Sequence, residues 1–179
     1  METRFYLAYL AKGELEDWYQ EIITNLYDKF NLVELKEKKR LAHITVKDPF
    51  LAENLGDVEK IVEGLTKREE EIVFDVSGIG HFENQIVYMG AETNLKGRRY
   101  IQRILDEFKT RKYEMSRYDQ WGKMLHMTVA KRKESGGRFE EVLAYLKENE
   151  KKFLVPFDNL VIMGKNRGES GIHKFFEIH

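Results

Sequence analysis

The sequence of 179 residues predicts a single α+β domain whose two halves, about 1–83 and 84–179, repeat each other. The length and the 42% hydrophobic content are sufficient for one sizeable buried core. Each half alternates apolar runs of strand length with amphipathic helical patterns, in the order strand, helix, strand, helix, strand. The third observation is a tetrapeptide of the form His-x-Thr-hydrophobic, which occurs once in each half, at 43–46 (HITV) and at 126–129 (HMTV).

The elements of the first half follow from apolar spacing and from breaks in the pattern. The apolar run 4–11 predicts a strand that Gly13 ends, and apolar residues at helical spacing predict a helix over Glu14–Phe30. Asp48-Pro49 ends the first motif strand, because proline cannot donate a hydrogen bond to a strand ladder. The remaining predicted elements are a loop or strand edge over 31–40, in which we expect the charge run Lys36–Arg40 to be solvated, a helix over 54–68 and a strand over 71–80.

The second half repeats this order and adds a basic segment. The predicted elements are, in order, a strand over 85–92, a helix over 95–110, the second motif strand over 123–131, a helix over 138–150 and strands over 154–164 and 172–179. Between residues 96 and 117 eight basic residues outnumber three acidic ones, which suits either a solvated helix face or a track for phosphates. Because the net charge of the chain is only −1, any nucleic-acid contact must come from such a local patch.

The repeat has a nearly constant offset. The two motif histidines are 83 positions apart, and VFDV at 73–76 is matched at the same offset by PFDN at 156–159. FYLAY at 5–9 is matched by VYMGA at 87–91 at an offset of 82. Two such halves related by a pseudo-twofold axis would bring both motif strands to the centre of one cleft, so we expect the two histidines to face each other.

Each motif places an imidazole and a hydroxyl side by side. In a strand, residues i and i+2 point to the same face, so His43 lies beside Thr45 and His126 lies beside Thr128. Two histidines across a cleft can act as base and acid in the cleavage of a phosphodiester, because imidazole exchanges protons near neutral pH. The threonine hydroxyls can donate hydrogen bonds to the phosphate oxygens. This chemistry requires no metal and no cofactor.

Two other interpretations of the motifs compete with catalysis. The His-Thr pairs can be structural polar residues of half-exposed strands, or the histidines can bind a metal, although the nearby Asp48 and Asp119 lack a ligand-like spacing. The absence of cysteine excludes disulfides, thiolate nucleophiles and cysteine-based zinc sites. The remaining histidines, which we expect to be solvated or structural, are His81, His173 and His179.

The motifs HITV and HMTV in a duplicated chain of this length resemble the two-histidine (2H) phosphoesterase superfamily, and in particular its 2′-5′ RNA ligase-like branch. The resemblance spans nearly the whole chain. It implies a bilobal fold in which two antiparallel sheets surround a central, V-shaped cleft, with helices packed outside. The catalytic residues that it implies are His43, Thr45, His126 and Thr128.

Four further residues are candidates for substrate contacts. Some members of the branch have an arginine just after the second motif; here Lys131 and Arg132 follow it, and strand alternation places Arg132 on the face of His126. Phe50 and Trp121 lie near the motifs in sequence and can either stack on a base or pack in the core.

The function that the resemblance implies is that of a metal-independent phosphodiesterase acting on 2′,3′-cyclic phosphates of RNA ends or nucleotides. With an RNA 5′-hydroxyl in place of water, the same site would join 2′-5′ ends. The sequence does not assign base and acid between the two histidines. The alternative function is a non-catalytic module that binds nucleotides or RNA ends. The N-terminal segment has too short an apolar run for a signal peptide or a membrane span, so we expect a cytoplasmic monomer without membrane contact.

Overall fold

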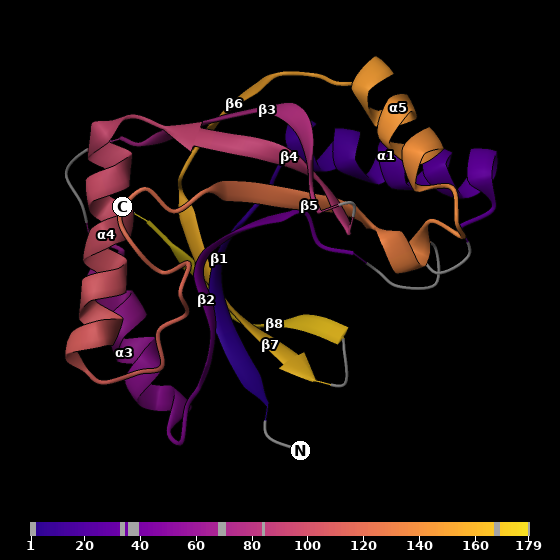
Figure 1. Ribbon diagram of the computed structural model, residues 1–179. Coiled ribbons are helices and arrows are strands. Elements are labelled where there is room, and N and C mark those ends of the chain that lie inside the picture. Colours follow the sequence, from indigo (N-terminus) through magenta and orange to yellow (C-terminus); the bar gives the residue numbers. More distant parts are fainter. Residues whose placement is uncertain are drawn as a thin grey trace.

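The computed structural model describes residues 3–32, 35, 40–67, 71–83, 85–166 and 169–178. Over these residues the chain forms one antiparallel sheet of eight strands with α-helices packed against it (Figure 1). The strands are β1 (Arg4–Leu10), β2 (His43–Leu51), β3 (Val73–Phe82), β4 (Ile86–Thr93), β5 (Leu125–Lys131), β6 (Phe153–Pro156), β7 (Asn159–Asn166) and β8 (Glu169–Glu177). The helices are α1 (Glu14–Phe30), α3 (Leu55–Leu65), α4 (Leu95–Thr110), α5 (Phe139–Glu148) and the short 3₁₀-helix η1 (Arg132–Glu134).

The predicted α+β class is confirmed, but the expected division into two sheets is wrong. The strand order is β6-β3-β4-β5-β2-β1-β7-β8. β2 and β5 pair in antiparallel register through Ile44 and Met127, and this β2–β5 junction joins the strands on its two sides into a single sheet. The sheet curls there, so that β3, β4 and β5 diverge from β7 and β8 in Figure 1. The duplication of the halves stays an interpretation of the sequence.

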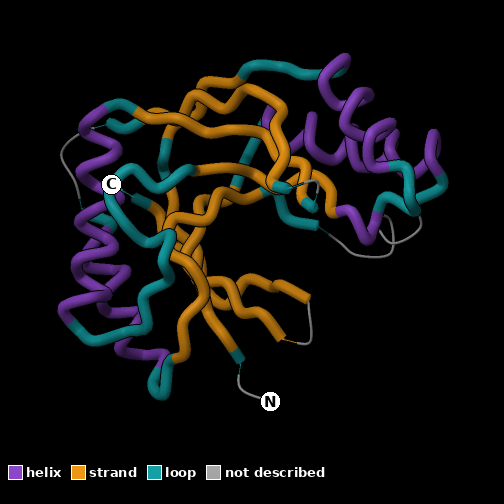
Figure 2. The backbone as a smooth tube through the Cα atoms, in the orientation of Figure 1, coloured by secondary structure: helices purple, strands orange, loops and turns teal. Residues whose placement is uncertain are grey.

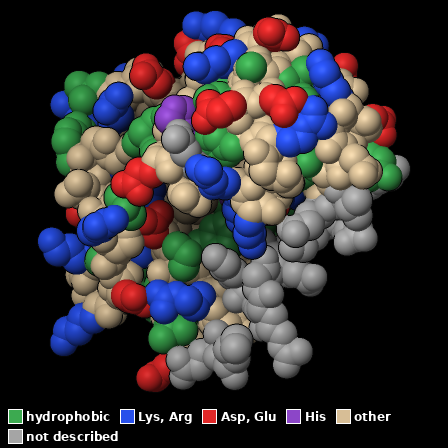
Figure 3. Space-filling view, turned by 45° about the vertical axis from the view of Figure 1, so that its right-hand side comes forward, with side chains coloured by type: hydrophobic (Ala, Val, Ile, Leu, Met, Phe, Trp, Pro, Cys, Tyr) green, Lys and Arg blue, Asp and Glu red, His purple; other side chains and the backbone are tan. Residues whose placement is uncertain are grey.

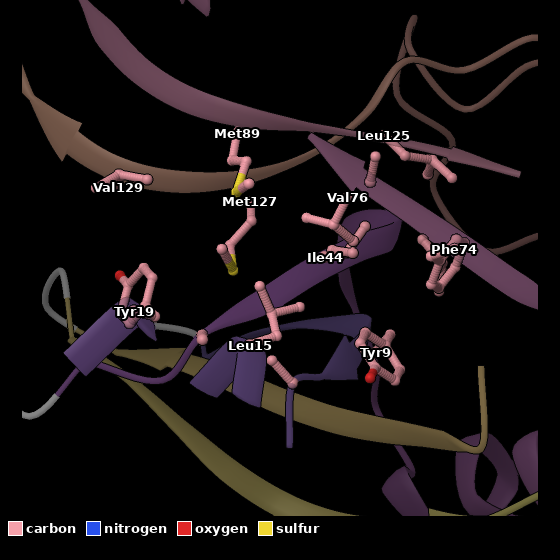
Figure 4. Close-up of a cluster of buried hydrophobic side chains, with 14 of the residues drawn as sticks. Tyr9, Leu15, Tyr19, Ile44, Phe74, Val76, Met89, Leu125, Met127 and Val129 are labelled. Carbon is pink, nitrogen blue, oxygen red and sulfur yellow. The ribbon is translucent and has the colours of Figure 1, made fainter. Parts of the chain in front are cut away.

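The helices lie at two ends of the sheet. Figure 2 shows α3 with α4 at one end and α1 with α5 at the other. Helix α1 contacts α5 and β6, α5 contacts β3, and α4 contacts both β2 and β4. The apolar helix faces and one face of the sheet form a continuous core. In Figure 4, Ile44 and Met127 of the junction point toward the side of the sheet on which Leu15 of α1 lies.

Local sequence explains where two of the helices begin and end. The Asn94 side chain accepts a hydrogen bond from the Gly97 amide and begins α4, as an N-cap does. Gly97 also has no room for a side chain, because a methyl group there would lie 2.0 Å from the Thr93 hydroxyl. Helix α1 ends at Phe30, and Asn31 follows with a φ of 54°, the left-handed conformation typical of a helix C-terminus.

The predicted strand over 154–164 is in fact two strands. β6 pairs with β3 and β7 pairs with β1, so the two lie far apart in the sheet order. Phe157 and Asp158 separate them. Asn159 fixes the start of β7, because its side-chain amide accepts a hydrogen bond from the Leu10 amide and donates one to the Leu10 carbonyl.

Some predictions fall outside the described residues. Of the charge run Lys36–Arg40 the structure describes Arg40, and His179 is likewise not described. In the part of the chain that is described, none of the helices is long and apolar enough to cross a membrane.

Candidate active site

The two His-Thr pairs meet at the centre of the sheet. The β2–β5 junction pairs the middle residues of the two motifs in antiparallel register. One residue to either side, His43 therefore lies across from Thr128, and Thr45 lies across from His126. These four residues form the corners of a square. The Cα atoms of two residues across from each other are about 4.5–5.5 Å apart, and those of two residues on a diagonal are about 7–8 Å apart. The histidines occupy one diagonal, and all four side chains are partly exposed.

The two imidazoles face main-chain carbonyl groups two residues earlier in the chain. Nδ1 of His43 lies 2.8 Å from the carbonyl oxygen of Leu41, a hydrogen bond that requires the proton on Nδ1. Nε2 is then the nitrogen that can accept a proton. The carbonyl of Met124 precedes His126 by the same two positions, although the buried Nδ1 of His126 forms no hydrogen bond of regular geometry with it.

Burial lowers the pKa of both histidines, because an imidazolium ion loses hydration in the sheet. The preceding carbonyl groups act in the opposite direction. Nearby charges add to these effects: His126 and Lys131 lower the pKa of His43 further, whereas at His126 Lys123 lowers the pKa and Asp48 raises it. Both imidazoles are therefore mainly neutral at pH 7 in the free protein.

Aromatic rings flank both imidazoles. The ring of Tyr6 lies 5.6 Å from that of His43, measured between centres. Phe82 and Tyr88 stack on each other at 4.4 Å, and their ring centres lie 5.0 and 5.4 Å from that of His126. The sequence did not predict these neighbours, because they come from β1, β3 and β4 and only the strand register brings them to the histidines.

Each motif strand carries a β-bulge just after its threonine. Between Thr45 and Lys47, β2 has one more residue than β1, and between Thr128 and Ala130, β5 has one more than β4. Two successive side chains of each strand are therefore buried, instead of alternating. These buried pairs are Val46 with Lys47, and Val129 with Ala130.

The second bulge reverses the predicted positions of Lys131 and Arg132. Simple alternation put Arg132 on the face of His126, but the extra residue returns Lys131 to that face, and its charge acts on His43. Arg132 instead begins η1 and is exposed, with its guanidinium group 5.9 Å from the centre of the Phe139 ring. The predicted placement of Arg132 is wrong because two side chains, and not one, turn inward between Thr128 and Lys131.

A buried ion cluster fastens the loop before β5 to the first bulge. Asp119 accepts hydrogen bonds from Lys47 (2.8 Å), Lys123 (3.1 Å) and the main-chain amide of Asp48 (3.0 Å). Lys123 also pairs with the Asp48 carboxylate. Burial raises the pKa of Asp119, but the hydrogen bonds from the Asp48 amide and Lys47 outweigh it and hold that pKa below its ordinary value. The two carboxylates considered for a metal site are thus bound to lysines.

The two aromatic candidates for substrate contact differ in exposure. Phe50 has no exposed surface and packs against Phe108 and Tyr113, with ring centres 5.0 and 5.4 Å away. Of the two roles predicted for this ring, the structure shows packing in the core and not stacking on a base. Trp121 is 54% exposed in the loop between α4 and β5, where base stacking stays a prediction.

The two other histidines that the structure describes, His81 and His173, are both exposed. His81 is exposed and its ring meets that of Phe139 edge-on at 6.2 Å. His173 of β8 is also exposed, and its Nε2 lies 3.0 Å from a carboxylate oxygen of Glu59 on α3.

The basic segment 96–117 covers the outer side of α4 and the turn after it, and its lysines and arginines are exposed. On the face in Figure 3, Lys and Arg side chains are interspersed with Asp and Glu, so no large area of one sign forms there. A hollow beside α4 includes Arg98, Gln102 and Lys123 in its lining, but none of the four motif residues. Both interpretations of the segment stay predictions.

Two His-Thr pairs that meet at the centre of a curled antiparallel sheet are typical of the 2H phosphoesterase class. The sequence family described as the 2′-5′ RNA ligase superfamily matches residues 15–169, and the chain belongs to this superfamily. The resemblance predicted from the two motifs is thereby confirmed. Membership supports a phosphoesterase or an RNA-end-processing enzyme in general.

Solved structures share the fold over almost the entire chain. A structure described as a phosphoesterase has a TM-score of 0.61 at 9% identity and covers 99% of both chains. TT0787 of Thermus thermophilus has a TM-score of 0.55 at 12% identity, over 98% of this chain and 97% of its own. LigT of E. coli, solved with NADP+, has a TM-score of 0.57 at 11% identity, over 99% and 98%. Such low identities show the fold alone. No curated protein matches the chain.

Proposed function

We propose that the protein is a metal-independent phosphodiesterase that opens 2′,3′-cyclic phosphates on RNA ends or nucleotides. The observation that carries this proposal is the antiparallel pairing of Ile44 with Met127, from which we infer that His43 and His126 lie on a diagonal, each across from a threonine. Main chains about 7–8 Å apart let two imidazoles reach one phosphate from opposite sides. In-line displacement at phosphorus needs this geometry, because the nucleophile enters opposite the leaving oxygen.

Each side chain has a separate task in this reaction. One histidine accepts a proton from the attacking water, and the other donates a proton to the ribose oxygen as its bond to phosphorus breaks. The hydroxyls of Thr45 and Thr128 donate hydrogen bonds to the non-bridging oxygens, on which negative charge gathers. Lys131 adds a positive charge near His43. With an RNA 5′-hydroxyl in place of water, the same steps form a 2′-5′ linkage.

Neighbouring charges favour His43 as the base in hydrolysis. Burial and the charges of His126 and Lys131 all lower its pKa and keep Nε2 able to accept a proton. At His126, beside the effect of burial, Lys123 and Asp48 act in opposite directions. A bound phosphodiester adds negative charge that raises the pKa of both histidines, and at His126 Asp48 acts in the same direction, which favours His126 as the group that carries the proton for the leaving oxygen.

The test is hydrolysis of a 2′,3′-cyclic nucleotide, and of RNA with a cyclic-phosphate end, in the presence of EDTA. Wild type should turn over, and His43→Ala and His126→Ala should each lose about 10²–10⁴-fold in kcat while keeping their circular dichroism. His81→Ala is the matched control and should keep full activity, because His81 is exposed outside the site. Binding of both substrates without turnover would identify the non-catalytic module instead.

A further inference from the structure

We propose that the buried pair of Glu134 and Arg40 is a positioning device that holds Lys131 on the histidine face of the sheet. This inference rests on the proposed function, because that function makes the histidine face the surface on which the substrate reacts. The contacts that support the device are independent of any reaction. They concern the main chain of the second bulge and the two side chains bonded to it.

Glu134 and Arg40 bind the main chain within the bulge and just after it. Glu134 is 5% exposed, and one of its carboxylate oxygens accepts a hydrogen bond from the Lys131 amide at 2.9 Å. The other oxygen lies 2.6 Å from Nη2 of Arg40. Nη1 of Arg40 donates to the carbonyl of Val129 at 3.2 Å. A bulge removes groups of this kind from the strand ladder, and buried polar groups need new partners.

These bonds determine which cation faces the histidines. With regular pairing after Thr128, Lys131 would point into the core and Arg132 would lie on the face of His126. The bulge requires both Val129 and Ala130 to turn inward, and this returns Lys131 to the open face. The Glu134–Arg40 pair supplies the hydrogen bonds that this conformation needs, so the pair selects lysine over the neighbouring arginine.

The pair also links the two motif strands to each other. Arg40 lies three residues before His43, and Glu134 lies in η1, directly after β5. The side chain of Arg40 is 13% exposed and that of Glu134 is 3% exposed, so the pair is shielded from water. A charge pair in such a place is costly to break on one side only, which makes it suitable for fixing one conformation of the bulge.

The first experiment is an NMR titration of the His43 imidazole in four proteins: wild type, Lys131→Ala, Arg40→Met with Glu134→Met, and the triple variant. Removing the lysine should raise the pKa of His43, because a nearby positive charge is lost. The two methionines are similar in volume to the side chains that they replace, and together the substitutions remove one positive and one negative charge. The pKa of His43 should therefore rise as much as in Lys131→Ala only if Lys131 leaves the histidine face. The triple variant should add nothing to Lys131→Ala. An unchanged His43 pKa in the methionine pair, or additive shifts, would overturn the proposal.

Glu134→Gln gives a second answer if the methionine pair does not fold. Losing the negative charge of Glu134 alone would lower the pKa of His43, whereas displacement of Lys131 would raise it. The direction of the change in the His43 pKa therefore distinguishes loss of the Glu134 charge from displacement of Lys131. A downward change would overturn the proposal.

Kinetics supply a readout that a merely structural role would not move. With a 2′,3′-cyclic nucleotide, Lys131→Ala and the methionine pair should each raise KM roughly tenfold and leave kcat within about twofold. Arg138→Met with Glu141→Met removes an exposed pair from the same region and should change neither constant. If wild type turns over no cyclic phosphate, the proposed function fails, and the His43 titration still decides whether the pair positions Lys131.

Discussion

The bulges of the two motif strands share a main-chain arrangement and differ in side chains. In both, the residue five positions after the histidine donates its amide to a buried carboxylate, Asp48 to Asp119 at 3.0 Å and Lys131 to Glu134 at 2.9 Å. Both carboxylates form ion pairs, Asp119 with Lys47 and Lys123, and Glu134 with Arg40. The residue whose amide is held is an aspartate in β2 and a lysine in β5.

Because of this difference, the two histidines have different charged neighbours, although the main chains on the two sides of the site are similar. Beside the larger effect of burial, Lys131 lowers the pKa of His43 and Asp48 raises that of His126. Each of these residues acts on the histidine of the other strand, because the strands are antiparallel. The proposed function, in which the two histidines have opposite tasks, requires such an inequality, and the residue just after each bulge supplies it.

The largest expected effect comes from replacing Lys131 with an acidic residue, so that an acidic residue stands five positions after each motif histidine. Lys131→Glu replaces the cation near His43 with an anion, and repulsion of the phosphate should lower kcat/KM at least about a hundredfold. The measurement is steady-state hydrolysis of a 2′,3′-cyclic nucleotide. Lys133→Glu, which changes an exposed residue of η1, is the control and should stay within a few fold. An equal loss in both variants would show a general charge effect.

The second effect compares the stability of the two anchors. Asp119→Asn leaves Lys47, which has no exposed surface, without its anionic partner, so the free energy of unfolding should fall by about 3–5 kcal/mol. Glu134→Gln should cost less, because the Arg40 side chain is 13% exposed whereas that of Lys47 has no exposed surface. Urea unfolding of both variants measures the difference. A larger loss for Glu134→Gln would contradict the comparison.

A third, smaller effect should be confined to the His126 side. A methyl group on Gly80 would lie 2.6 Å from the Tyr88 hydroxyl, so Gly80→Ala must displace the ring that packs against His126. We expect kcat to fall several-fold, with a loss of stability of about 1–3 kcal/mol. Gly64→Ala is the matched control, since a methyl group there meets no atom within 4 Å. If both variants have wild-type kcat, the aromatic wall does not orient His126.

The smallest effect is on the pH dependence of stability. A histidine with a lowered pKa binds its proton less readily in the folded than in the unfolded state. The free energy of unfolding should therefore be level above the unfolded pKa of about 6.5 and should fall as the pH drops below it. His43→Gln should flatten this fall, as measured by urea unfolding between pH 7.5 and pH 5, roughly. A slope identical to wild type would contradict a lowered pKa at His43.

The sequence predicted what depends on local pattern. The two motif strands and the amphipathic helices follow from spacing alone, and the family follows from His43, Thr45, His126 and Thr128. The two consecutive apolar residues Val129 and Ala130 were a signal of the second bulge that simple alternation overlooked.

Other features depend on contacts between distant segments. Lys47 is a lysine with no exposed surface, and nothing in its own sequence predicts burial without knowledge of Asp119, which lies 72 positions away. Whether the strands form one sheet or two depends on the pairing of Ile44 with Met127. Tyr6 and Tyr88 reach the histidines only through strand pairing. Phe50 is a core residue because α4 and the turn after it cover the ring with Phe108 and Tyr113.

The junction pair Ile44 and Met127 connects the packing of the core with the separation of the two motif histidines. Both side chains are fully buried on the helix-covered face, yet their main chains set the separation of His43 and His126 on the other face. A change in the volume of either side chain would therefore change the distance between the two histidines, which under the proposed function is the gap that the phosphate spans. Under the proposed function, substitutions in the hydrophobic interior would therefore change the rate of hydrolysis without altering any group that touches the substrate.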